Sequence, residues 1–229
     1  LGTNVVLAGA SLAGPSALTI GKANNTASLT LNNDMSAAGP ISLMAGYITL
    51  AGNLTSTGAG AVNGLISLTS YGGLGVQQVP ATPSRIVTAP FVSVTGTNNT
   101  VWLGSNNVIG TVAITGATNA RVVNAGALTV GTAGGLSGIS ASGTIVAMTN
   151  TGDLTIAGNI TTSSTSAYAT QLEAGYNTAA LVSSGGNIVL SGSPSFSTGS
   201  GGVTRLFTGS VAGSTAAAAL VGSGSGRFR

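Results

Sequence analysis

Short segments in which one small or polar residue separates two aliphatic residues recur along the whole chain. Such alternation is typical of a half-buried β-strand, because successive side chains point to opposite faces of a strand. Residues 29–31 (Leu-Thr-Leu) and 154–156 (Leu-Thr-Ile) are examples. Gly, Asn or Ser stands close to nearly every segment and favours a turn there. The pattern therefore predicts many short strands joined by tight turns.

The spacing of these segments predicts a repeat of roughly 16–20 residues. The spacings are 19 and 18 residues between the segments that begin at Leu29, Ile48 and Ile66, and 20, 16 and 17 between those that begin at Val92, Val112, Leu128 and Ile145. Residues 46–55 and 152–161 also match in character at every position except Tyr47 and Asp153. Stacked repeats of this size pair each strand with the repeats before and after it. The sequence thus predicts an all-β fold, a β-solenoid with coils of roughly 16–20 residues.

The aliphatic residues of the segments are expected to form the core of the solenoid, with the middle residues facing outward. One coil cannot bury its aliphatic side chains alone, so the coils are expected to stack. The predicted core stack contains Leu29, Leu31, Ile48, Leu50, Ile66, Leu68, Val112, Ile114, Leu128, Val130, Leu154, Ile156, Ile188 and Leu190.

The solenoid is predicted to cover residues 1–190, with a loop insertion at about 71–90. Pro80, Pro83 and Pro90 lie in this insertion, and proline cannot donate a hydrogen bond to a strand ladder. From 191 to 229 the alternation loosens, which predicts a terminal coil or linker region. A short helix at Thr215–Val221 is one alternative for part of this region.

The composition argues against several classes of protein. Charged residues form 4% of the chain and hydrophobic residues 43%, which is the reverse of the balance in a disordered chain. The six basic residues are dispersed apart from those at the very end, so nucleic-acid binding is not expected. No apolar stretch approaches the roughly 18 residues of a membrane helix. A membrane barrel is disfavoured by an aromatic content of 4%, because barrels carry aromatic girdles.

Residues that perform catalysis are scarce. Histidine and cysteine are both absent, which removes the usual general base, thiolate nucleophile and zinc ligands. Asp34, Asp153 and Glu173 are the only carboxylate side chains, and their wide spacing gives no paired-carboxylate motif for sugar cleavage. The sequence therefore predicts a non-enzymatic protein with no catalytic, cofactor-binding or metal-binding residues.

Three residues are candidates for surface contacts with a partner. Trp102 stands between Val101 and Leu103, so alternation predicts an outward side chain, although packing beneath a neighbouring loop is an equal alternative. Tyr71 and Arg85 lie in the predicted loop insertion, and long loops often carry binding functions. A neutral insertion is the alternative for that loop.

The sequences Gly-Asn-Leu-Thr at 52–55, Gly-Asn-Ile-Thr at 158–161 and Gly-Gly-Asn-Ile-Val-Leu at 185–190 carry a family resemblance. With the Thr-rich alternating segments, they resemble filamentous haemagglutinin-like exoproteins of Gram-negative bacteria, which use two-partner secretion. The likeness covers about residues 5–190. It implies a right-handed parallel β-helix that is released or exposed at the cell surface and acts in adhesion, aggregation or biofilm formation.

These observations predict an extracellular structural or adhesive rod, a segment of a large surface exoprotein or of a self-assembling filament. The expected partners are further copies of the chain or neighbouring domains of the exoprotein, with surface glycans as another candidate. Low charge and unpaired strand edges favour self-association. A carbohydrate- or ice-binding solenoid is the alternative, although no sustained Thr-x-Thr column suited to ice is visible.

Overall fold

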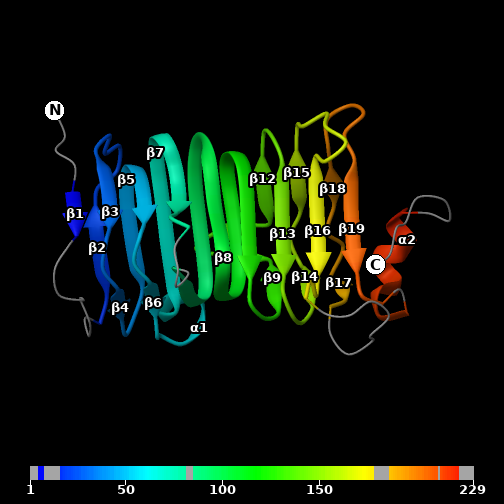
Figure 1. Cartoon of the computed structure of the whole chain (residues 1–229), viewed down its shortest axis with the longest axis horizontal. Helices are drawn as coiled ribbons and strands as arrows, with labels where there is room; N and C mark the ends of the chain where they lie inside the picture. The colour runs from blue at the N-terminus through cyan, green and yellow to red at the C-terminus, as the bar shows by residue number, and fades with distance from the viewer. Residues whose placement is uncertain (1–4, 8–15, 81–84, 178–185, 211, 222–229) are drawn as a thin grey trace.

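The computed structural model describes residues 5–7, 16–80, 85–177, 186–210 and 212–221. In Figure 1 the strands follow one another along the long axis of the molecule, and α2 lies at the C-terminal end. The elements are β1 (Val5–Leu7), β2 (Leu18–Gly21), β3 (Ser28–Leu31), β4 (Met35–Ala37), β5 (Ile41–Leu50), β6 (Leu54–Ser56), α1 (Gly60–Asn63), β7 (Leu65–Gln78), β8 (Val87–Asn124), β9 (Leu128–Val130), β10 (Thr132–Ala133), β11 (Leu136–Ser137), β12 (Ile139–Ala141), β13 (Ile145–Thr149), β14 (Leu154–Ile156), β15 (Ile160–Thr162), β16 (Thr170–Ala174), β17 (Ile188–Leu190), β18 (Phe196–Ser197), β19 (Thr204–Thr208), η1 (Ala212–Ser214) and α2 (Thr215–Val221).

Parallel pairing between strands far apart in sequence builds one 17-stranded sheet. The pairs form three series, which we call ladders A, B and C. Ladder A contains β2, the beginnings of β5 and β7, two parts of β8, β12, β15 and β18. Ladder B contains β1, β3, the ends of β5 and β7, two further parts of β8, β13, β16 and β19. Ladder C contains β4, β6, the remaining paired parts of β8, β9, β14 and β17.

The long strand β8 shows how the chain moves between ladders. It passes through ladders C, A and B, and then through the same three ladders again (Figure 1). A Cβ at Gly116 would collide with the carbonyl oxygen of Gly96 one pass earlier, and the φ of Gly116 is +69°. Both facts favour glycine at this close approach of successive passes. The antiparallel hairpin of β10 and β11 is a separate two-stranded sheet.

Most paired residues lie farther apart in sequence than the predicted repeat of roughly 16–20 residues. Separations are 19 positions for Leu29 and Ile48, 25 for Ile41 and Ile66, and 34 for Leu154 and Ile188. The predicted repeat is too short because successive segments along the chain belong to different ladders. Ile48 pairs with Val76 in ladder B, whereas Ile66, the start of the next segment used for the spacing, pairs in ladder A.

The aliphatic residues of all three ladders form the core. Thirteen of the fourteen residues of the predicted core stack are at most 2% exposed. The remaining residue, Leu190, is half-buried and packs against the same core cluster. Burial of a Leu or Ile side chain contributes about 1.5–3 kcal/mol, so this core is the main source of stability.

The segment predicted as a loop insertion is largely strand. β7 continues to Gln78 and β8 begins at Val87, which leaves 79–86 between them; residues 81–84 lie outside the described part. Pro90 lies within β8, between the residues that pair in ladder C and those that pair in ladder A. Proline is tolerated there because no ladder hydrogen bond requires its missing N–H.

The C-terminal region extends the ladders and then covers one of them. β18 and β19 continue ladders A and B, and α2 spans the residues considered as a helix. Ala217 of α2 is 2% exposed and belongs to the core cluster. The Ser214 hydroxyl accepts a hydrogen bond from the Ile188 N–H at 3.0 Å and lies 2.7 Å from the Thr208 hydroxyl. η1 and α2 therefore cover the end of ladder C at β17.

Buried side-chain amides support the turns between ladders B and C. Asn107 Oδ1 accepts hydrogen bonds from the Val87 N–H at 2.8 Å and from Gln78 Nε2 at 2.7 Å. Asn124 Oδ1 accepts from the Ile109 N–H at 2.8 Å. Buried polar groups require hydrogen-bond partners. The two amides provide partners for backbone groups that no neighbouring strand reaches.

Candidate functional site

The outward rows of the three ladders differ in the size of their side chains. Ladder A presents Thr19, Ser42, Ser67, Ser140, Thr161 and Ser197, and Ser93 of the same row is buried. Ladder C presents Ser36, Thr55, Thr88, Thr111, Thr129, Thr155 and Val189. Ladder B presents Thr30, Thr49, Gln77, Trp102, Arg121, Val146, Gln171 and Arg205. Long side chains that can reach a ligand are therefore concentrated on ladder B, and we call this row the ladder B face.

Trp102 is the most exposed member of the first half of the ladder B face. Its side chain is 41% exposed, and a Cβ at Gly104 would collide with the indole Nε1. The indole therefore lies against the strand, over the space that a side chain at 104 would occupy. The guanidinium carbon of Arg121 lies 5.1 Å from the ring centroid, within the range of a cation–π interaction. The ring is thus held in place and still partly open to solvent.

A second aromatic–arginine pair lies toward the C-terminal end of the ladder B face. The guanidinium carbon of Arg205 lies 4.0 Å from the centroid of the Tyr168 ring. The Nε–H of Arg205 donates to the Ala167 carbonyl at 2.8 Å, and Tyr168 is 56% exposed. Sequence reasoning did not identify Tyr168, Arg121 or Arg205, because only the strand register shows which residues share a face.

The three predicted surface contacts lie in different parts of the fold. Tyr71 is half-buried in β7, between the residues that pair in ladders A and B. Arg85 is half-buried just before β8, and its Nε is buried without a hydrogen-bond partner. Only Trp102 belongs to the ladder B face.

The carboxylates are engaged in local hydrogen bonds. Asp34 accepts from the Asn53 backbone N–H at 2.9 Å and from Asn53 Nδ2 at 3.0 Å. These hydrogen bonds, with a smaller contribution from the Arg85 charge, hold the pKa of Asp34 below its ordinary value. Asp153 accepts from the Asn187 N–H at 2.9 Å. Glu173 is 3% exposed and accepts from Gln171 Nε2 at 3.3 Å. Among the described residues there is no group of three or more His, Cys, Asp or Glu that could hold a metal ion.

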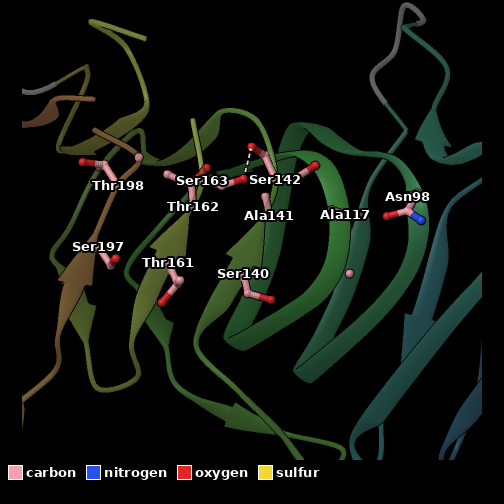
Figure 2. A pocket seen from close by; sticks show the side chains of 12 residues that line it. Asn98, Ala117, Ser140, Ala141, Ser142, Thr161, Thr162, Ser163, Ser197 and Thr198 are labelled. Atoms are coloured by element: carbon pink, nitrogen blue, oxygen red, sulfur yellow. Dashed lines mark hydrogen bonds between the residues drawn. The ribbon is translucent and has the colours of Figure 1, made fainter. Parts of the chain in front are cut away.

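A groove with a volume of ≈ 510 Å³ runs along ladder A beside the turns toward ladder B. Figure 2 shows Ser140, Thr161 and Ser197 on neighbouring strands, with Ser142 and Ser163 at the turns above them. The Ser163 hydroxyl donates to the Ser142 carbonyl at 2.9 Å. The lining residues carry hydroxyl and amide groups but no charge, so the groove is neutral.

Comparisons with known proteins do not identify this chain. No family model matches it, and neither the curated proteins nor the solved structures contain a significant match. In the described part of the chain, no helix is long and apolar enough to cross a bilayer. The resemblance to haemagglutinin-like exoproteins therefore stays a prediction from the residues.

Proposed function

We propose that this chain is a right-handed parallel β-helix, a β-solenoid, and that it acts as a non-enzymatic structural and adhesive rod outside the cell. It would form a segment of a large surface exoprotein or of a self-assembling filament of a Gram-negative bacterium. The observation that carries this proposal is the succession of parallel pairs along three ladders. Repeated passes through ladders A, B and C would produce such a rod, with its length set by the number of passes.

The ends of the ladders support assembly into longer structures. Among the described residues, β2 and β4 pair on one side only, with β5 and β6. At the other end β18 and β19 also pair on one side only, with β15 and β16. Unpaired strand edges accept further strands, either from the same polypeptide or from another copy. With only 4% charged residues, electrostatic repulsion between neighbouring rods is weak.

The outward rows favour adhesion over catalysis as the role of the rod. Ladders A and C present mainly hydroxyl groups, whereas long polar and aromatic side chains are concentrated on the ladder B face. Such a face offers contacts along the length of a rod. Carbohydrate binding is a second candidate function, favoured by the exposed ring of Trp102.

Ice binding receives less support from the same rows. Thr111, Thr129 and Thr155 are in register on ladder C, but each strand contributes one Thr. Thr129 and Thr155 are flanked by aliphatic residues that face the core, and Thr111 lies between Gly110 and Val112. The Thr-x-Thr pattern that would suit an ice surface is therefore not formed by this column.

The rod and its assembly can be tested by cryo-electron microscopy together with sedimentation of the purified chain. We expect elongated particles, which at high concentration join into fibres with an axial repeat of about 4.8 Å. The Leu18 N–H donates to the Pro40 carbonyl, so the N–H of the next residue, Thr19, faces the unpaired side of β2. Thr19→Pro removes this N–H and should therefore reduce fibre formation. Ser42→Pro, on a strand paired on both sides, serves as the control that damages the fold itself. Compact monomers without three parallel faces would contradict the β-solenoid, and monomeric rods at all concentrations would contradict the filament.

A further inference from the structure

We propose that the ladder B face binds a carboxylated polysaccharide, with Trp102 stacking on a sugar ring and Arg121 binding a carboxylate. The inference rests on the proposed adhesive function and deepens it by naming the ligand class.

Trp102 provides the apolar contact. A sugar ring has one face made mainly of C–H groups, which packs against the flat surface of an aromatic ring. The indole of Trp102 is partly open to solvent and lies over Gly104, with Arg121 5.1 Å from its centroid. Aromatic side chains provide large contact areas with little loss of conformational entropy, because few side-chain angles must be fixed.

The arginines provide the charge selectivity. Arg121 contacts the Trp102 ring, and Arg205 contacts the Tyr168 ring and the Ala167 carbonyl. Among the described residues, neither guanidinium is paired with a carboxylate. Nε of Arg121 is buried, so a ligand would be bound by the Nη groups. A guanidinium binds a carboxylate through two parallel hydrogen bonds. The charge on this face therefore complements an acidic ligand.

The arrangement of the two aromatic–arginine pairs favours a linear ligand. Arg121 pairs with Val146, Val146 with Gln171, and Gln171 with Arg205. Three steps of about 4.8 Å separate the two arginines by about 14 Å. A linear oligosaccharide can contact both pairs, whereas one monosaccharide can contact only one of them.

The surroundings of the ladder B face are compatible with an acidic ligand. Glu173 lies on the same ladder, but its side chain is 3% exposed and accepts a hydrogen bond from Gln171. Asp34 and Asp153 precede strands of ladder C and bond to Asn53 and Asn187 there. Two arginines on one face are too few for the clustered cations of a nucleic-acid site, and the polar row is not an apolar protein interface.

The test is titration of the full chain with hexagalacturonate, followed by the fluorescence of Trp102, which is the single tryptophan. The matched probe is the same oligomer with its carboxylates reduced to alcohols. We expect hexagalacturonate to change the emission and to bind about tenfold more tightly than the reduced oligomer or a dimer, which corresponds to about 1.4 kcal/mol. Higher salt should weaken binding of the acidic oligomer.

Variants then assign the contacts by isothermal titration calorimetry. Trp102→Ala and Arg121→Gln should each weaken binding about tenfold, and Gly104→Ala should weaken it by displacing the indole. Arg85→Gln, which removes an arginine outside the ladder B face, should bind like the parent chain. Equal binding of the reduced oligomer, unchanged binding by Trp102→Ala and Arg121→Gln, or no binding by the parent would each overturn the proposal.

Failure of this inference is distinguishable from failure of the proposed rod. The same samples are examined for rod shape and fibres by electron microscopy. A chain that forms rods and fibres but does not bind hexagalacturonate retains the structural function and refutes the ligand. A chain that binds the oligomer through Trp102 and Arg121 but forms no rod supports the binding face and refutes the architecture.

Discussion

The middle of the sheet and its C-terminal end use the same parallel pairing, but they bury their aliphatic residues to different extents. Ile48 and Leu68 in the middle are completely buried, whereas Leu190, Phe196 and Leu206 near the C-terminal end are only partly buried. In the middle, a strand such as β5 or β7 has partners on both sides. At the end, β17, β18 and β19 each pair on one side only among the described residues. Pairing therefore aligns the side chains in both regions, whereas Leu190, Phe196 and Leu206 are less completely covered than the core residues in the middle.

The turns of the two regions also differ. In the middle, the amide of Asn107 is completely buried and bonds to the nearby Leu103 carbonyl and to backbone groups of Val87 and Val123 in adjacent passes. At the C-terminal end, Asn159 is exposed, and its Oδ1 accepts one hydrogen bond from the Ser195 N–H at 2.9 Å. The paired residues Ile160 and Phe196 are 36 positions apart, so a longer connection separates these strands. Helix α2 compensates over ladder C, where Ala217 joins the core.

The largest expected effect is the difference between two Leu-to-Ala substitutions. Leu68→Ala should lower the free energy of unfolding by about 2–5 kcal/mol, because it creates a cavity between strands paired on both sides. Leu190→Ala should cost about 1 kcal/mol, because the half-buried side chain loses less contact area. Urea-induced unfolding followed by circular dichroism measures both. Equal losses would show that the C-terminal end is as tightly packed as the middle.

The turns provide the next contrast. Asn107→Ala should lower the free energy of unfolding by about 2–3 kcal/mol, because the Val87 N–H and Gln78 Nε2 lose their acceptor in a buried site. Asn159→Ala is the matched substitution at the exposed end and should cost less than about 1 kcal/mol, because water can replace its single bond. The same urea titrations compare them. A loss at Asn159 that matches the loss at Asn107 would refute the distinction between buried and exposed turns.

The sequence predicted the strands better than their arrangement. Alternation at 154–156 indicates a strand because the period of two is local, and this segment is β14. The strand partner of Ile48 could not be predicted, because several aliphatic segments are equally suitable as partners. Only the complete strand pairing in the structure identifies Val76 as that partner. Within the candidate site, alternation predicted the outward direction of Trp102, and the structure places this side chain on the ladder B face. The contact of Arg121 with that ring could not be predicted, because its position beside the ring depends on the length of the intervening turns.

The smallest expected effect concerns the first of the acidic turns, where Asp34 accepts two hydrogen bonds from Asn53. These bonds lower the pKa of Asp34 below 3.8 in the folded chain. A lowered folded pKa means that the stabilisation is fully present above the unfolded pKa and is lost as the pH falls through the folded pKa. The carboxylate is exposed, so solvent screening limits the contribution to less than about 1 kcal/mol. Urea titrations of the parent and Asp34→Asn at pH 7 and pH 3 should therefore give a larger difference between the two chains at pH 7.

Asn53→Ala should move the Asp34 titration, followed by carboxyl NMR, upward toward its ordinary value. The Asn53 backbone N–H still donates to Asp34 in this variant, so an unchanged titration would show that the Asn53 side-chain amide does not contribute to the lowered pKa of Asp34.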